Sequence, residues 1–277
     1  MSADRVTRHG LDVGRLVAGG PAHVSFLSAG QGEPVLLLHG FASDAHDDWV
    51  ETGWFEALVA AGFEVIAPDL RGHGRSVKSR DPLDYRLDAF AGDVAALCDH
   101  GWGGRRFSLI GYSMGAHVAM SVALAATGRL SSLVLGGMGE RIATTVGLAP
   151  EFADALDAQE GDWPADRPAL PSYAVRFSQH AASRPFNELG VLAACLRGQS
   201  SVFDLEGMSR VTAPTLVMVG ALDKLAGAAH PVAAHFPRGV GETVPGVNHA
   251  TALADGHFRT RAVAHLADTS ATSGSST

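Results

Sequence analysis

The chain has 277 residues and a net charge of −8, and this acidic balance argues against a nucleic-acid partner because phosphate binding needs clustered Lys and Arg side chains. Hydrophobic residues make up 46% of the chain and charged residues 18%, which is typical of a globular protein with a sizeable core. Lys78 and Lys224 are the only lysines, and no apolar run approaches the length of about 18 residues needed for a membrane span, so we expect no membrane contact.

The N-terminus and the two cysteines indicate the cellular compartment of the protein. Residues 1–6 carry early charges of both signs and no apolar stretch, so we expect no signal peptide. Cys98 and Cys195 lie far apart in helix-like segments, which favours two free, buried or half-buried thiols over a disulfide framework or a metal knuckle. We therefore expect a cytoplasmic protein.

Predicted strands and helices alternate along most of the chain. The predicted strands cover residues 24–29, 34–39, 64–69, 106–112, 131–136, 214–221 and 240–244, and the predicted helices cover 52–61, 88–99, 114–127, 229–236 and 249–267. The strand segments are apolar nearly throughout, as expected when helices cover both faces of a parallel sheet. This alternation predicts an α/β fold with short right-handed crossovers.

Two segments depart from the alternation. Residues 139–207 separate two predicted core strands and contain no convincing strand of their own, so we expect several short helices joined by proline-containing turns. Residues 268–277 consist almost entirely of Ser, Thr, Ala and Gly, a composition that predicts a disordered tail.

Residues 111–115, Gly-Tyr-Ser-Met-Gly, stand where an apolar strand meets a helix of small residues. In this context Gly-x-Ser-x-Gly indicates a nucleophile elbow, a sharp turn that lifts the serine oxygen out of the backbone. Side chains at Gly111 and Gly115 would clash in such a turn. Ser113 is therefore a candidate nucleophile, provided that a base takes its proton.

Two downstream residues complete the expected catalytic set. Asp223 ends an apolar strand, and His249 follows a strand and a Pro-Gly turn and is expected to open a helix. The gaps, 223 − 113 = 110 and 249 − 223 = 26 residues, leave room for an insertion and then for one helix and one strand. The order Ser, Asp, His differs from the orders found in chymotrypsin-type and subtilisin-type proteases.

With these motifs in order from about residue 34 to 265, the chain resembles the capped, esterase-like and lactonase-like serine hydrolases of the α/β-hydrolase fold. Residues 34–41 resemble the strand and His-Gly-x oxyanion loop of that family, and residues 65–76 resemble its next strand-and-turn signature. The resemblance implies a mostly parallel central sheet with helices on both faces. It divides the chain into a core (residues 1–138 and 208–267), a small helical cap insertion (139–207) and the disordered tail (268–277).

The resemblance also implies a role for each site residue. Ser113 would attack an acyl carbonyl, His249 would accept and return the proton, and Asp223 would orient the imidazole. The backbone N–H groups of Phe41 and Met114 would form the oxyanion hole.

A second carboxylate remains open as the triad acid. Some relatives carry the acid after the preceding core strand, where this chain has Glu140. Glu140 lies several residues late and beside Arg141, so Asp223 is the favoured acid.

The sequence predicts neither a metal nor a cofactor. The ligand-type residues around the oxyanion loop lack a recognisable metal spacing; they are His39, Asp44, His46, Asp47 and Asp48. No glycine-rich nucleotide-binding pattern follows a strand.

The leading hypothesis is a cofactor-free serine hydrolase that cleaves an ester, lactone or thioester of a small-molecule acyl substrate. Carbon–carbon bond hydrolysis, cofactor-free perhydrolysis and a small-molecule receptor that keeps the triad remain open, as do the substrate and the oligomeric state. We expect the cap to set substrate choice without carrying chemistry. Its aromatic side chains suggest an apolar pocket; they are Phe152, Trp163, Tyr173, Phe177 and Phe186.

Overall fold

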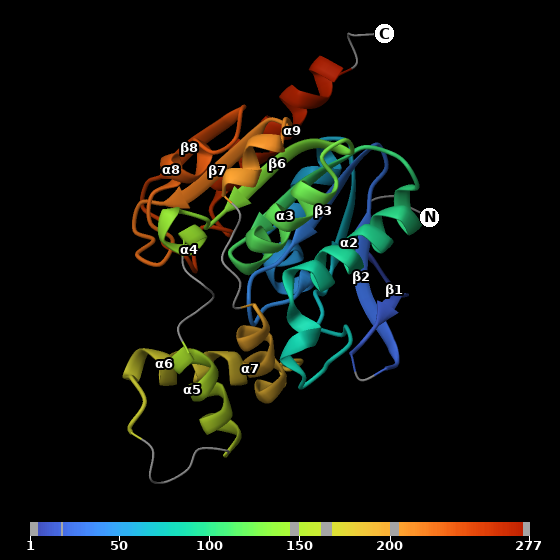
Figure 1. Ribbon diagram of the computed structural model, residues 1–277. Helices are drawn as coiled ribbons and strands as arrows, with labels where there is room; N and C mark the ends of the chain where they lie inside the picture. Colours follow the sequence, from blue (N-terminus) through green and yellow to red (C-terminus); the bar gives the residue numbers. More distant parts are fainter. Residues whose placement is uncertain (1–4, 18, 145–149, 162–167, 200–204, 274–277) are drawn as a thin grey trace.

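The computed structural model describes residues 5–17, 19–144, 150–161, 168–199 and 205–273. Its strands are β1 (Thr7–Arg15), β2 (Pro21–Ala29), β3 (Glu33–Leu38), β4 (Phe63–Pro68), β5 (Phe107–Tyr112), β6 (Leu130–Gly136), β7 (Thr215–Gly220) and β8 (Gly239–Val244). They form one twisted sheet in the order β1-β2-β4-β3-β5-β6-β7-β8 (Figure 1). The strands from β4 to β8 in this order are parallel, while β2 pairs antiparallel with both β1 and β4.

Helices cover both faces of the sheet, as the sequence predicts. The helices of the core are α1 (Trp54–Ala60), α2 (Leu87–Trp102), α3 (Met114–Ala125), α8 (Ala229–Ala233) and α9 (Gly256–Ser273), with short helical turns η1 (His46–Val50) and η2 (Pro82–Tyr85). Helices α2, α3 and α8 contribute to the hydrophobic core on one face, and α1 and α9 contribute to the core on the other.

Strand β3 illustrates why the core strands are apolar throughout. Leu36 and Leu38 pack into the core with α2 and α3, while Val35 and Leu37 pack into the core with α1 and α9. All four side chains are fully buried. A strand covered on both faces has no solvent-facing side, so the polar alternation of a half-exposed strand is lost. The predicted fold class is therefore confirmed, and each predicted strand is present with its ends moved by at most three residues.

A group of short helices separates β6 from β7. They are α4 (Glu140–Thr144), α5 (Pro150–Glu160), α6 (Ser172–Ala182), α7 (Leu189–Gly198) and η3 (Glu206–Arg210). Figure 1 shows α5, α6 and α7 gathered beside one edge of the sheet, where Leu156, Leu192 and Leu196 form a small core of their own. We call residues 139–207 the insertion; its domain boundaries stay a prediction, and Trp163 lies outside the described residues.

Strand β1 was missed in the sequence. Its residues are exposed or half-buried from end to end, and it pairs with β2 alone. An edge strand of this kind needs no apolar face of its own, because the neighbouring strand supplies the hydrogen bonds that define it. The sequence therefore carries little periodic signal there.

The last helix differs from the prediction at both ends. It begins at Gly256 rather than at residue 249, because Asn248 accepts the N–H groups of Ala250 and Thr251 in a turn and Asp255 caps the helix through the N–H of Phe258. It continues to Ser273, so residues 268–273 are helical rather than disordered. Thr269 is buried and donates its hydroxyl to Leu266, and this packing extends the helix into a polar sequence. Residues 274–277 lie outside the described residues.

Candidate active site

Ser113 occupies the turn between β5 and α3 with a backbone φ of 52°. Strain of this kind costs roughly 1–3 kcal/mol and persists only where the surroundings enforce it. The two flanking glycines permit it. A Cβ on Gly111 would lie 2.3 Å from the carbonyl oxygen of Gly115, and a Cβ on Gly115 would lie 2.0 Å from that of Leu38. Only glycine fits at either position, as expected for an elbow.

The carboxyl edge of the sheet brings Ser113, Asp223 and His249 together. They follow β5, β7 and β8, which are parallel, so the segments after these strands meet at one edge. His249 Nε2 lies 2.8 Å from Ser113 Oγ, and His249 Nδ1 lies 2.7 Å from Asp223 Oδ2. The three side chains thus form one hydrogen-bonded row.

The environment of Asp223 determines which atoms donate and which accept the hydrogen bonds of this row. Its side chain is fully buried, and its Oδ1 accepts the N–H groups of Leu225 and Ala226 at 3.0 and 2.9 Å. Burial by itself would raise the pKa of Asp223, but the hydrogen bond and charge of His249 and these two N–H groups hold that pKa below its usual value. An ionised carboxylate only accepts, so Nδ1 of His249 donates to it and Nε2 offers a lone pair to the serine hydroxyl.

Glu140, the alternative acid, lies elsewhere. It is exposed at the start of α4, and its backbone N–H donates to the carbonyl of Ala228. The carboxylate that contacts His249 is that of Asp223.

The backbone N–H groups of Phe41 and Met114 are the two donors that the sequence predicts for an oxyanion hole. Met114 opens α3 directly after Ser113, where the first N–H groups of a helix have no partner within the helix. In the part of the chain that the structure describes, neither Phe41 nor Met114 donates its N–H to another residue. Among the described residues, both N–H groups are thus left without a protein acceptor.

The loop that carries Phe41 is held by two side chains, His39 and Asp48, that were considered in the sequence only as possible metal ligands. His39 Nδ1 donates to the carbonyl of Gly40 at 2.7 Å, while His39 Nε2 accepts the N–H of Leu70 at 2.9 Å. Because the C=O of Gly40 and the N–H of Phe41 belong to one planar peptide and point in opposite directions, the bond to the carbonyl also restrains the N–H from the N-terminal side of Phe41.

Asp48 binds the same loop through both of its carboxylate oxygens. Its Oδ2 accepts the N–H of Gly40 at 2.7 Å, and its Oδ1 accepts the hydroxyl of Ser43 at 2.5 Å. Burial raises the pKa of Asp48. Asp48 was grouped in the sequence with possible metal ligands, and nothing local in the sequence marks its structural role.

Tyr112, also missed in the sequence, contacts His249. Its hydroxyl donates to the carbonyl of His249 at 2.5 Å, and the two rings lie 5.4 Å apart. Tyr112 is the variable residue between Gly111 and Ser113 in the elbow motif. Its place in that motif was the only feature of the sequence that could have indicated a contact with the site.

Aromatic side chains of the insertion reach Phe41. The ring of Phe177 in α6 stacks on that of Phe41 at 5.8 Å, and Phe152 in α5 packs edge-on against Phe177 at 5.0 Å. Phe186 does not join them, because its ring lies under the Arg75 guanidinium at 4.4 Å.

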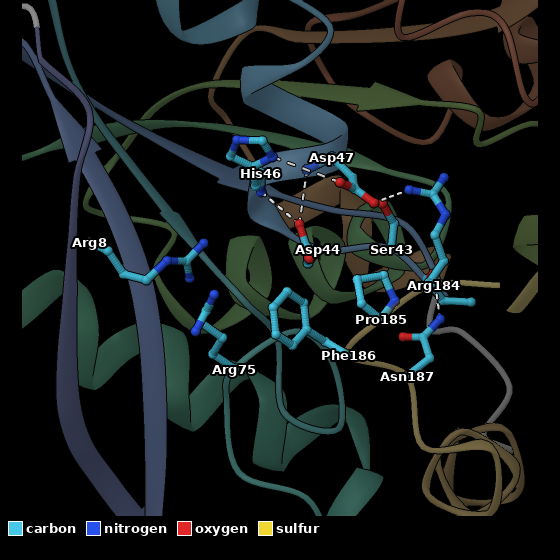
Figure 2. A pocket seen from close by; sticks show the side chains of 11 residues that line it. Arg8, Ser43, Asp44, His46, Asp47, Arg75, Arg184, Pro185, Phe186 and Asn187 are labelled. Atoms are coloured by element: carbon cyan, nitrogen blue, oxygen red, sulfur yellow. Dashed lines mark hydrogen bonds and ion pairs between the residues drawn. The ribbon is translucent and has the colours of Figure 1, made fainter. Parts of the chain in front are cut away.

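Phe186 instead lines a separate open pocket of about 320 Å³ between the core and the insertion (Figure 2). The pocket is lined by Arg8, Ala42, Ser43, Asp44, His46, Asp47, Arg75, Arg184, Pro185, Phe186 and Asn187. None of the three residues of the hydrogen-bonded row lines it, so it is distinct from the space beside Ser113.

The described residues contain no group of three or more His, Cys, Asp or Glu side chains that could hold a metal ion. Within the same part of the chain, no helix is both long and apolar enough to cross a membrane. Cys98 and Cys195 are buried free thiols, as predicted.

Comparison with known proteins places this geometry in context. A family model described as alpha/beta hydrolase fold matches residues 33–181. A non-heme chloroperoxidase of Streptomyces lividans is 29% identical over 214 residues, which cover 70% of this chain and 75% of that protein. Epoxide hydrolase B of Mycobacterium tuberculosis is 39% identical over 93 residues, but the match spans 34% of this chain and only 25% of that protein.

Solved structures are similar over nearly the whole chain. A thermophilic esterase from Thermogutta terrifontis has a TM-score of 0.71 and 24% identity, covering 92% of this chain and 97% of that one. A putative lipase from Acinetobacter baumannii has a TM-score of 0.73 and 20% identity, covering 98% and 94%. At this level of identity the likeness establishes the fold.

Proposed function

The chain belongs to the alpha/beta hydrolase fold family, and within it we propose a serine hydrolase that cleaves a carboxylic ester, lactone or thioester through an acyl-enzyme intermediate. The observation that carries the proposal is the hydrogen-bonded row from Asp223 through His249 to Ser113. A serine hydroxyl is a weak nucleophile until such a base accepts its proton.

The proposed reaction has two steps, formation and hydrolysis of the acyl-enzyme, and the same groups act in both. His249 Nε2 takes the proton of Ser113 as its Oγ attacks the acyl carbonyl, and the N–H groups of Phe41 and Met114 stabilise the oxyanion. The imidazolium, stabilised by Asp223, then protonates the leaving alcohol or thiol. Water, deprotonated by His249, then attacks the acyl-enzyme, and the imidazolium returns this proton to Ser113 Oγ as the acid leaves.

The residue at the elbow also bears on the similarity to epoxide hydrolase B. A nucleophilic acid at this position would form an ester with an opened epoxide, whereas this chain has Ser113. Serine favours acyl transfer, because the alkoxide generated by the base attacks a carbonyl and the oxyanion donors match the resulting charge.

Perhydrolysis is a second candidate, favoured by the match to the non-heme chloroperoxidase over 70% of this chain. In that reaction hydrogen peroxide replaces water as the attacking group on the acyl-enzyme and a peracid leaves. The same triad would serve both reactions, so the two are distinguished by the nucleophile that the enzyme accepts.

The test combines labelling with turnover. The wild type, Ser113→Ala and the control Ser209→Ala, an exposed serine of η3, are treated with a fluorophosphonate and assayed on p-nitrophenyl esters and lactones of graded chain length, with and without hydrogen peroxide. We expect labelling and turnover in the wild type and the control, and a loss of about 10⁶ in kcat for Ser113→Ala.

Each other outcome selects an alternative. Ligand binding without turnover on any ester would support a small-molecule receptor. Peracid formation faster than hydrolysis would support the perhydrolase. Retention of a tenth of wild-type kcat in Ser113→Ala would exclude the serine mechanism.

A further inference from the structure

The oxyanion loop, residues 40–43, contains a strained residue of its own. Ala42 has a φ of 59°, a left-handed conformation that alanine rarely adopts. Such a conformation persists only when neighbouring groups enforce it. The core supplies contacts on the N-terminal side of Phe41, where His39 and Asp48 bind the carbonyl and N–H of Gly40.

The contact on the C-terminal side of Phe41 comes from the insertion. Asn187 lies between α6 and α7, is half-buried, and donates from Nδ2 to the carbonyl of Ala42 at 2.9 Å. The same Nδ2 donates to the carbonyl of Ala181, near the end of α6, at 3.0 Å. One amide group therefore joins the strained loop to a helix of the insertion.

A second contact runs beside it. Arg184, three residues before Asn187, forms an ion pair with Asp47 of η1. Figure 2 shows Arg184 and Asn187 side by side on the insertion segment, with Ser43 and Asp47 facing Arg184. These two polar contacts accompany the stack of Phe177 on Phe41. Among the described residues, the contact of Asn187 is the one in which the insertion bonds the backbone of the oxyanion loop.

We propose that Asn187 is a positioning residue for the oxyanion hole and that it makes the alignment of the Phe41 N–H depend on the docking of the insertion. The proposal rests on the proposed serine hydrolase function. With the Gly40 carbonyl bound to His39 and the Ala42 carbonyl bound to Asn187, the Phe41 backbone is fixed from both sides.

The consequence is a site that is complete only when the insertion is docked. Without the Asn187 contact, Ala42 relaxes toward a more common backbone conformation, and this rotation displaces the adjoining Phe41 peptide. The insertion then contributes to catalysis through the backbone of the core, in contrast to the expectation that it only selects substrates.

The experiment compares two variants of Asn187 with a matched control. Asn187→Ala removes the amide, and Asn187→Asp keeps its size but has no N–H to donate when ionised. Arg184→Gln breaks the neighbouring ion pair and leaves the Ala42 contact intact. The readouts are kcat and KM on an activated ester and hydrogen–deuterium exchange of the peptides that contain residues 40–43, with melting temperatures measured to confirm folding.

We expect both Asn187 variants to lower kcat by about tenfold to a hundredfold with KM changed less than threefold, because a displaced donor weakens transition-state binding most. Exchange at residues 40–43 should become faster in both. Arg184→Gln should change kcat less than threefold and leave exchange at these residues as in the wild type.

Three results would overturn the inference: unchanged exchange in the Asn187 variants, faster exchange with kcat unaltered, or an equal loss of kcat in Arg184→Gln. Failure of the proposed function looks different. In that case the wild type itself shows no Ser113-dependent turnover, while the exchange measurement still decides whether Asn187 holds the loop.

Discussion

At the scale of single residues, the candidate site depends on the direction of individual hydrogen bonds. The carboxylate of Asp223 accepts from His249 and from two backbone N–H groups, which leaves Nε2 of His249 as the acceptor that faces Ser113. An amide in place of this carboxylate could donate to the imidazole and reverse its tautomer. Nε2 would then carry a proton and could not serve as the base.

We therefore expect Asp223→Asn to lower kcat by about 10⁴. Glu140→Gln, the matched control on the alternative acid, should change kcat less than threefold, because Glu140 is exposed on α4. Steady-state kinetics on one activated ester decide between them. The reverse ranking of the two variants would move the triad acid to Glu140.

The same row predicts a pH dependence of kcat/KM. A protonated His249 cannot accept the proton of Ser113, so kcat/KM should fall as the pH is lowered. Asp223 does not limit this fall, since its pKa is lowered and the carboxylate stays ionised below the pH at which an imidazole gains its proton. A profile that stays flat from pH 8 down to pH 5 would contradict a histidine base.

At the scale of elements, the insertion contacts the site through an aromatic stack. Phe177 of α6 covers the ring of Phe41, and Phe152 of α5 supports Phe177 from its edge. Another link between core and insertion joins Arg80 to Glu160, whose carboxylate also accepts the N–H of Gly190 in α7. The stack, and not this ion pair, contacts Phe41, the proposed oxyanion donor.

Trimming the stack should change substrate preference. Because Phe177 contacts Phe41, we expect Phe177→Leu to shift the preferred acyl chain length, with a change of about tenfold in the ratio of kcat/KM between short and long esters. Phe186→Leu is the control, since its ring lies against Arg75 in the separate pocket and should leave that ratio unchanged.

Fluorophosphonate labelling of Ser113 serves as the second measurement. A small label should still react with the Phe177 variant, because no triad residue changes. Equal shifts in chain-length preference for Phe177→Leu and Phe186→Leu would contradict the assignment of the stack as the selective element.

At the scale of the whole molecule, the two cores bury several groups that ionise at alkaline pH. Burial raises the pKa of Cys98 and of Cys195 to about 12, and it also raises the pKa of Tyr85 and of Tyr112. In the unfolded chain these thiols and phenols ionise at pH values of about 8.5 and 10. The folded state therefore keeps protons that the unfolded state loses.

The free energy of unfolding should consequently fall as the pH rises above about 9. The unfolded state binds fewer protons there, so each buried group lowers stability by up to about 1.4 kcal/mol per pH unit until its folded-state pKa is reached. Urea unfolding between pH 8 and 11 measures the slope. The double variant Cys98→Ala/Cys195→Ala should show a shallower slope, and an unchanged slope would contradict the assignment to the thiols.

Much of the fold could be predicted from the sequence because its signals are local. Apolar strands, the glycines of the elbow and the order of Ser113, Asp223 and His249 depend on residues close together in the chain, and the known family order relates one motif to the next. The start of α9 was misplaced, because Asp255 caps the helix later than the apolar pattern suggested.

Contacts between groups far apart in the chain could be found only in the folded structure. The carbonyl of Ala42 lies 145 positions from the amide of Asn187 that binds it, and the Tyr112 hydroxyl lies 137 positions from the carbonyl of His249. The exposed strand β1 likewise exists because β2 lies beside it. Such contacts depend on how the parallel strands and the insertion pack in space, and the polar side chains that make them carry no periodic pattern. The amino-acid sequence therefore predicted which residues gather at the carboxyl edge of the sheet, but not the groups that hold them in place.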